Sequence, residues 1–351
     1  MVSLSDIARE VNLNISVVSR ALNPNPDRHA VVKAETRERV REVARRMGYV
    51  PNRAASFCGR KSSATIFCFL PETADRLTAD LMFGIVHAAG QENFPVKFFR
   101  GSSSDDFGRF LQAIRQQEHS GLITYPPLAL GREMQQMLGQ YHENRRTILM
   151  LNAMTNTGTD GLEQEFCDIP QLGIDEYYGG VLAAKHLIDQ GCTRFARSYL
   201  PPHPYRERLA GFCDTVRAAG FPEPEMLLTE ADFAHLAENS AERTGIYADR
   251  DVHAFNILVY LARKNIVPGE GNILLVGNDD KQQARYSLPT LTTVRQPACE
   301  EGELAVKKLI NMIYGKKEEN QLLKPTLIVR QSSGNSGEVY EITEQQKGRK
   351  R

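Results

Sequence analysis

Cysteine is scarce in this chain, and none of it is arranged as a site. The six cysteines are scattered over 351 residues, without a C-x-x-C pair or a nearby group of histidines. Neither a disulfide framework nor a zinc site is therefore predicted, and we expect reduced thiols in a cytoplasmic protein.

Long apolar runs and common enzyme motifs are also missing. No run approaches the roughly 20 residues of a membrane helix, and no basic-then-apolar leader begins the sequence. The chain has no GxxxxGK phosphate loop, no GxGxxG after a predicted strand, no GxSxG and no HExxH. We expect no membrane association, metal, cofactor or catalytic residue, and an enzyme stays only as a competing class.

The chain has no net charge, but its charges are unevenly distributed. Residues 1–61 hold twelve Lys and Arg against six Asp and Glu, so the remaining residues carry a matching excess of acid. A basic segment on an acidic body favours a polyanionic partner for that segment, such as DNA.

Two short helices with a tight turn are predicted near the N-terminus. Apolar residues recur at helical spacing from Leu4 to Val11, and Ser3 with Asp6 resembles a capping box. Asn14 can cap a second helix, so the segment reads as a helix-turn-helix.

The second helix would present Ile15, Ser16, Val17 and Arg20 on its outer face. Short side chains allow close approach to a DNA groove, and Arg20 can bind a guanine edge or a phosphate. An ordinary helical hairpin with a solvated polar face explains these residues equally well.

A third helix is predicted over residues 35–47, ending at Gly48. Some of its arginines follow a glutamate by four residues, as Arg46 follows Glu42. Part of the basic charge would then be neutralised within the helix itself.

Four segments resemble the headpiece of the lactose-repressor (LacI) family, in family order. They are DIA at 6–8, VSRALN at 18–23, ETRERV at 35–40 and GYVPNR at 48–53. The resemblance implies operator recognition by Ile15, Ser16 and Arg20, while Val17 removes a hydroxyl contact. Asn52 and Arg53 would then meet the DNA backbone.

Residues 51–62 correspond to the hinge of that family. The resemblance implies a short helix that forms on the operator, with a leucine wedged into the minor groove. Cys58 stands at the leucine position, and its neighbour Phe57 is a known type of intercalating side chain. A flexible linker is the alternative.

The remainder of the chain alternates between short apolar runs and helical patterns, which predicts an α/β doubly wound architecture. Strands are predicted at 65–70, 96–99, 122–124, 148–151, 245–248 and 273–276, and helices at 79–91, 105–117, 179–190, 206–219 and 251–264. About 270 residues exceed one typical domain, so we expect two lobes with a cleft at the strand C-termini.

This body is similar to the LacI-family effector domain, which is like a periplasmic sugar-binding protein. Matching segments are GCTR at 191–194, RLAGF at 208–212, VGNDD at 276–280, ARY at 284–286 and LTTVRQP at 291–297. The predicted division is a helix-turn-helix headpiece at 1–50, a hinge at 51–62 and a two-lobed effector and dimerisation domain at 63–330. A poorly ordered polar tail at 331–351 completes it.

The resemblance places a small ligand against Arg208, Asp251, Asp279 and, less directly, Asp175. Carboxylates facing a guanidinium suit a polyhydroxylated ligand, although these charges could instead pair and brace the lobes. Several positions depart from the family: residues 75–78 lack its aromatic surface, and Asn152 and Glu176 replace a common Asp and Asn.

The sequence thus indicates a DNA-binding transcriptional regulator, more readily a repressor than an activator. A homodimer or larger assembly would bind double-stranded operator DNA, under control of a small effector, most simply a carbohydrate. Control by a partner protein, or by no effector, is the main alternative. A sugar-binding transport receptor is a competitor from another class.

Overall fold

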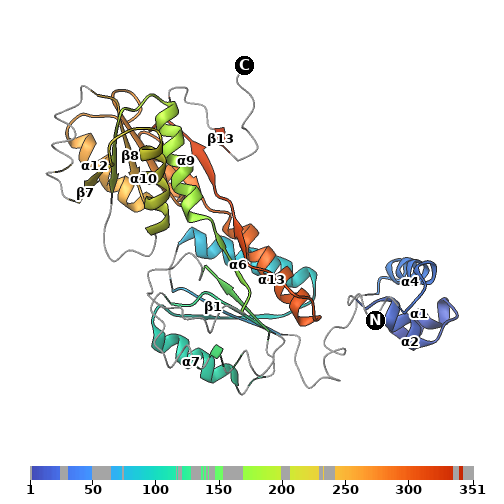
Figure 1. Ribbon diagram of the computed structural model, residues 1–351. Helices are drawn as coiled ribbons and strands as arrows, with labels where there is room; N and C mark the ends of the chain where they lie inside the picture. The colour runs from blue at the N-terminus through green and yellow to red at the C-terminus, as the bar shows by residue number, and fades with distance from the viewer. Residues whose placement is uncertain are drawn as a thin grey trace.

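The computed structural model of the protein describes a helical headpiece and a body of two α/β lobes (Figure 1). The described residues are 2–23, 31–49, 65–72, 75–115, 121–127, 147–152, 169–198, 206–228, 242–334 and 340–342, with positions 117, 136, 138, 139, 141 and 232. Within these residues, every helix is too short or too polar to span a bilayer.

In the described part of the headpiece, three helices surround a small apolar core. They are α1 (Leu4–Glu10), α2 (Ile15–Ala21) and α4 (Ala34–Arg46). Ile7, Val18 and Val40, one from each helix, are completely buried. The predicted capping box is present, because the Ser3 backbone N–H donates to Asp6 at 2.9 Å while Asp6 N–H donates to the Ser3 hydroxyl at 3.3 Å. The helix-turn-helix prediction is confirmed.

Arginines of α4 bind α1. The Arg46 guanidinium pairs with Glu10 at 2.7 Å, and Arg39 donates to the backbone oxygen of Val11 at 3.3 Å. The sequence pairs each of these arginines with a glutamate four residues earlier on the same helix. In the structure they instead link α4 to α1 and stabilise the module.

The first lobe is a six-stranded parallel sheet with helices on both faces. Its strand order is β11-β5-β4-β3-β1-β2. The bounds are β1 Ile66–Leu70, β2 Val96–Arg100, β3 Gly121–Thr124, β4 Thr147–Leu151, β5 Gln171–Ile174 and β11 Gln321–Leu323. Helices α6 (Arg76–Gln91) and α13 (Ala298–Ile313) cover one face, and α7 (Ser104–Arg115) lies on the other.

The second lobe is a seven-stranded sheet in the order β13-β12-β10-β9-β8-β6-β7, in which β12 runs antiparallel to both neighbours. The bounds are β6 Arg194–Ser198, β7 Glu225–Leu227, β8 Thr244–Ala248, β9 Ile273–Asn278, β10 Thr292–Arg295, β12 Thr326–Val329 and β13 Tyr340–Ile342. Helices α9 (Glu176–Asp189) and α10 (Arg206–Ala218) cover one face, and α12 (Asp251–Arg263) covers the other.

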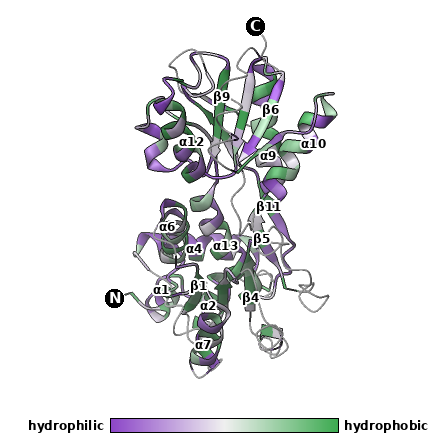
Figure 2. Ribbon diagram, turned by 90° about the vertical axis from the view of Figure 1, so that its left-hand side faces the viewer, coloured by the Kyte–Doolittle hydropathy of each residue, from purple (hydrophilic) through white to green (hydrophobic). Residues whose placement is uncertain are grey.

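Several strands of the body are buried along their whole length. Every residue of β1 and β9 is buried, and Figure 2 shows β9 and β4 as hydrophobic while the covering helices are mixed. In β1, Ile66 and Cys68 face α6 and α13, while Phe67 and Phe69 face α7. A strand buried on both faces reads as a continuous apolar run, and this is why the sequence located these strands.

The chain passes between the lobes three times, after β5, after β10 and after β11. The predicted doubly wound, two-lobed architecture is confirmed, with the ends of predicted elements shifted by no more than one helical turn. The sequence-based list lacked α13, β5, β6, β7 and β10–β13. Helix α13 carried a detectable signal, since Ala298, Ala305 and Leu309 recur at helical spacing and are buried.

The segment that the sequence assigns to a polar tail begins inside the second lobe. Ser332 and Ser333 are 0% and 1% exposed. The Ser332 hydroxyl donates to the Leu275 carbonyl at 2.6 Å and accepts from Thr292 N–H at 2.8 Å. Strand β13 extends the second sheet further. Polarity suggested exposure here, but these polar groups are satisfied by buried backbone.

Ser332→Ala tests this assignment. The change would leave a buried amide and a buried carbonyl without their partner, so we expect a loss of about 1–3 kcal/mol in the free energy of unfolding. Urea denaturation measures it. Ser102→Ala removes an exposed hydroxyl and should change stability by less than about 0.5 kcal/mol. Equal effects of the two variants would contradict the assignment.

Candidate functional site

Helix α2 exposes a compact surface at its N-terminal end. Asn14 caps the helix by accepting from Ser16 N–H at 2.9 Å. Ile15 is 46% exposed, and Ser16 and Arg20 are exposed as well. No carboxylate among the described residues pairs with Arg20, so its guanidinium is available to an external anion.

Val17 differs from the sequence-based expectation. It is half-buried and packs against the headpiece core instead of facing outward. The helix is only seven residues long, and Val17 precedes the buried Val18, so part of its side chain is covered by the same core. The hinge residues Asn52, Arg53, Phe57 and Cys58 lie outside the described residues.

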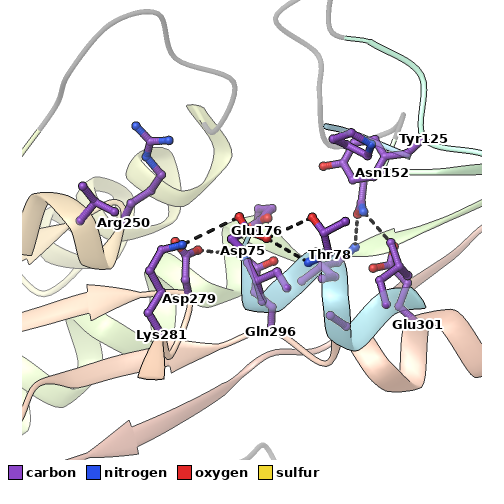
Figure 3. Close-up of a pocket in the computed structure, with 16 residues that line it drawn as sticks. Asp75, Thr78, Tyr125, Asn152, Glu176, Arg250, Asp279, Lys281, Gln296 and Glu301 are labelled. Atoms are coloured by element: carbon purple, nitrogen blue, oxygen red, sulfur yellow. Dashed lines mark hydrogen bonds and ion pairs between the residues drawn. The ribbon is translucent and has the colours of Figure 1, made fainter. Parts of the chain in front are cut away.

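A cavity of about 180 Å³ lies between the two lobes (Figure 3). Residues that follow or end parallel strands line it: Pro71 after β1, Tyr125 after β3, Asn152 after β4, Arg250 after β8 and Asp279 after β9. The predicted cleft at the strand C-termini is therefore present. The other lining residues are Asp75, Leu77, Thr78, Leu81, Ile174, Glu176, Val252, Lys281, Gln296, Ala298 and Glu301.

Two close helix crossings hold the walls of this cavity. In the second lobe, a Cβ added at Gly180 of α9 would lie 1.9 Å from the Arg208 carbonyl of α10. In the first lobe, a Cβ at Gly84 of α6 would lie 2.0 Å from the Cys299 carbonyl of α13. Only glycine permits such contact, which lets each helix pair cross closely beside the cavity.

The turn after β9 sends two adjacent carboxylates in different directions. Asp279 and Asp280 have φ angles of 122° and 48°, a conformation that L-residues rarely adopt. Asp279 lines the cavity, whereas Asp280 is completely buried and accepts from Arg330 and from Arg295. Although burial acts to raise it, these two hydrogen bonds hold the pKa of Asp280 below its usual value.

Arg208 is a buried support for the cavity wall. It is 1% exposed, and its Nη2 and Nε donate to the two carboxylate oxygens of Glu176. Its Nη1 lies 3.5 Å from Asp279 Oδ1 and donates to the Asp249 carbonyl at 2.8 Å. Arg208 does not line the cavity itself, so the predicted direct contact is replaced by alignment of two lining carboxylates.

Two other predicted positions are also absent from the lining. Asp251 is completely buried, where it accepts from the Thr293 hydroxyl at 2.6 Å and from Lys281 N–H at 2.7 Å. Asp175 caps α9 by accepting from Tyr178 N–H at 2.9 Å. Both side chains brace the segments that carry the cavity. Asp279 is the predicted residue that lines it.

Burial raises the pKa of the two aspartates on this side of the cavity. For Asp251 the main cause is burial, followed by the charge of Asp279. For Asp279 burial is again the main cause, opposed by Arg208 and Lys281. The second lobe thus offers a carboxyl group that is poised to change its charge when a ligand alters its surroundings.

The first lobe contributes polar residues that the sequence did not assign to a site. Asp75 caps α6 by accepting from Thr78 at 3.0 Å, and Asn152 donates to Glu301 at 2.8 Å. Asp75, Asn152 and Glu176 were noted only as departures from the family pattern, and all three line the cavity. Glu301 was missed because α13, whose apolar periodicity was detectable, was not among the predicted helices.

Ion pairs connect the lobes at the mouth of the cavity. Arg76 Nη1 at the start of α6 donates to the Asp280 backbone oxygen at 2.7 Å and lies 3.6 Å from its carboxylate. Lys281 Nζ lies 3.8 Å from Asp75. The 75–78 segment, which lacks the aromatic surface of the family, therefore supplies charges that join the two lobes.

No group of three side chains suited to a metal ion occurs in the described part of the chain. The cavity walls present carboxylates, amides, hydroxyls and two cationic groups, which can donate to and accept from a small polar molecule.

Two family models match the chain. The model described as "Bacterial regulatory proteins, lacI family" matches residues 3–52, and the "Periplasmic binding protein-like domain" matches residues 184–333. The chain therefore joins a LacI-family helix-turn-helix domain to a periplasmic-binding-protein-like domain. It is a DNA-binding transcriptional regulator with a two-lobed periplasmic-binding-protein-like body.

Curated relatives match this chain over most of its length. CelR of Thermobifida fusca is 26% identical, with 94% of this chain and 98% of that protein covered. Catabolite control protein A of Priestia megaterium is 22% identical, with 88% and 91% covered. These proteins are similar along both the headpiece and the body.

Solved structures share the fold of this chain. The lac repressor dimer bound to operator and the anti-inducer ONPF gives a TM-score of 0.63 at 22% identity, covering 95% of this chain and 99% of that one. A CelR–cellobiose complex gives 0.64 at 22% identity, covering 95% and 100%.

The buried Glu301 predicts that the stability of the folded protein depends on pH. Burial, as the main cause, raises the pKa of Glu301 to about 8. The folded protein then keeps a proton that the unfolded chain releases near pH 4.5. Stability should therefore fall as pH rises from about 5 to about 8, by up to about 1.4 kcal/mol per pH unit from this group.

Urea denaturation at pH 5.5, 6.5 and 7.5 measures this dependence. Glu301→Gln resembles the protonated acid and cannot ionise, so it should flatten the decline. Glu300→Gln, on the exposed side of α13, should leave it unchanged. The same slope in wild type and Glu301→Gln would show that Glu301 ionises normally in the folded protein.

Proposed function

We propose that the protein is a repressor that binds a near-palindromic operator as a homodimer, with its DNA affinity set by a small polyhydroxylated effector in the cavity. The observation that carries this proposal is a cavity between two lobes with polar groups on both walls, in a chain that also carries an exposed recognition helix. The cavity then has a binding role and no catalytic one.

The DNA-contacting face is assigned to α2. Ile15, Ser16 and Arg20 project from the N-terminal capped helix and would enter the major groove of each half-site. We assign Asn52 and Arg53 to backbone contacts and Phe57 or Cys58 to the minor-groove wedge. These four assignments rest on the resemblance of the hinge sequence to the family.

The effector is assigned to the cavity because its polar groups suit hydroxyls. Asp279 and Asn152 can accept from hydroxyl groups, and Lys281 can donate to them. Among similar structures, one is a CelR–cellobiose complex and another is a LacI-family regulator from Enterococcus faecium with bound ribose. We infer a carbohydrate or derivative here as well.

Homodimer formation is supported by exposed apolar side chains on both lobes. Phe83 and Val86 on α6 are 65% and 53% exposed, and Tyr286 and Leu288 after β9 are 74% and 89% exposed. Side chains of this type are characteristic of interface cores. One similar structure is a lac repressor dimer bound to operator.

Control would operate through the angle between the lobes. A ligand that contacts both walls favours the closed arrangement, and this changes the separation of the two hinges in a dimer. Effector and operator must then affect each other's affinity by the same factor.

Arg20→Ala tests the recognition helix. The operator can be obtained by selecting tight-binding sequences from random duplex DNA with the wild-type protein. We expect the variant to lose about 1–3 kcal/mol of affinity for that sequence and to discriminate less against a scrambled one. Gel-shift titrations at one fixed salt concentration provide both values.

Arg45→Ala removes the same charge from an exposed position on α4. It should reduce binding to both DNA sequences equally, if at all. An equal loss on both sequences for Arg20→Ala would reassign Arg20 from base recognition to phosphate contact.

A thermal-shift screen of the full chain tests the effector site. A panel of monosaccharides, disaccharides, uronic acids and sugar phosphates would be used. A bound compound at about 100 times its Kd should stabilise the protein by about 2.7 kcal/mol and raise its Tm. Asp279→Asn should abolish the shift, while Asp189→Asn, at the exposed end of α9, should retain it. A shift that survives Asp279→Asn would move the site elsewhere.

A further inference from the structure

The two ends of the cavity differ in charge. The cationic lining groups, Arg250 and Lys281, lie at one end beside Asp279, and Glu301 lies at the other end beside Asn152 (Figure 3). Asp75 and Glu176 lie between them. These four lining carboxyl groups differ in whether a cationic side chain lies close to them.

Three of the four carboxyl groups are paired. Glu176 receives two hydrogen bonds from Arg208, and Asp279 lies 3.5 Å from the same guanidinium. Asp75 lies 3.8 Å from Lys281 Nζ. These cations therefore offset much of the negative charge of the carboxylates in the second lobe and at the cavity mouth.

Glu301 is the exception. Its side chain is 2% exposed, and Oε1 accepts one hydrogen bond from the Asn152 amide at 2.8 Å. Among the described residues, no Lys or Arg lies within ion-pair distance of it, and none donates to Oε2. The one charged residue that acts on it noticeably is Glu176, which is also acidic.

The surroundings of Glu301 are suited to one end of a small polar molecule. Thr78 and Tyr125 bring hydroxyls to the same wall, and Leu81 and Ala298 bring apolar surface. Asn152 is fixed by accepting from Ile174 N–H at 3.1 Å through its other amide atom. A rigid acceptor group therefore faces the cavity without a cation opposite it.

We propose that the effector carries a protonated amino group, which binds the Glu301 carboxylate while the hydroxyls of the same molecule contact Asn152 and the Asp279 end. This inference rests on the proposed function of the cavity and specifies the ligand as an amino sugar or another aminated polyol. An ammonium group fits because it has three hydrogen-bond donors and supplies the positive charge that no Lys or Arg of the described residues brings to Glu301.

Proton exchange accompanies this binding. In the empty cavity the protonated form of Glu301 is favoured, since burial raises its pKa to about 8. When the ammonium group arrives, the carboxyl group gives its proton to solvent and keeps the negative charge. Lys281 offsets the charge on Asp75. After burial itself, the charge on Glu176 acts to keep Glu301 protonated, and the positive charge of the ammonium group opposes that effect.

The alternative for the same residue is a neutral carboxylic acid that donates to a ligand carbonyl or hydroxyl. Glutamine at position 301 imitates that neutral form and retains the acceptor for Asn152. Glu301→Gln therefore separates the two roles, and it preserves shape and the neighbouring hydrogen bond.

The experiment is isothermal titration calorimetry on the full chain at pH 6.5. The probes are glucosamine, galactosamine and mannosamine, each compared with its parent hexose and its N-acetyl derivative, in which the nitrogen is uncharged. We expect one amino sugar to bind at least about 10-fold more tightly than its two uncharged counterparts. Its apparent enthalpy should change between buffers of different ionisation enthalpy, which reports the released proton.

Glu301→Gln should remove the preference for the amino form and leave binding of the parent sugar within about threefold. Glu300→Gln should behave like wild type. Equal or tighter binding of a parent or N-acetyl sugar overturns the inference but leaves the proposed function intact. Silence from all nine compounds, in protein that still binds its selected operator, overturns the inference and leaves the DNA-binding role standing.

Discussion

The buried carboxylate of Asp280 is the constraint on which the arrangement of the body depends. It has no exposed surface and is surrounded by arginines from four places: Arg330 directly after β12, Arg295 at the end of β10 where the crossover begins, Arg285 after β9, and Arg76 at the start of α6. A charge removed from water requires such partners, because leaving it unpaired would cost several kcal/mol. One aspartate thus connects the second sheet, one crossover and the opposite lobe.

Its neighbour, Asp279, shows how the same turn produces a binding surface. The positive φ angles of both residues direct one carboxylate into the ionic cluster and the other into the cavity. Arg208, held behind Glu176, lies close enough to Asp279 to moderate its charge. The close crossings of α9 with α10 and of α6 with α13 bring the remaining walls to this point. Structural ion pairs therefore adjoin the cavity, and some of them, such as Asp75 with Lys281, include residues that line it.

Sequence patterns were most informative where local interactions decide the structure. The headpiece helices, the capping box at Ser3 and the buried strands were all found in advance, because capping and apolar periodicity involve residues close in sequence. Short strands with polar residues, such as β6, were missed because long-range pairing, and not their composition, makes them strands. Ser332 and Ser333 were misjudged for a related reason, since their hydroxyls bond to groups that are distant in sequence.

The candidate site was only partly predictable. The sequence by itself determined the family, the helix-turn-helix, the α/β body and the position of a cleft at the strand ends. The tertiary structure alone decided which charges face that cleft: Asp279 lines it, Asp251 and Arg208 lie behind it, Asp175 caps a helix, and Glu301 enters from a helix far along the chain. The reason is geometric. The sequence shows that a residue carries a carboxylate or a guanidinium, but it does not show whether that group is paired. The crossing of distant helices and the direction of a turn determine its neighbours.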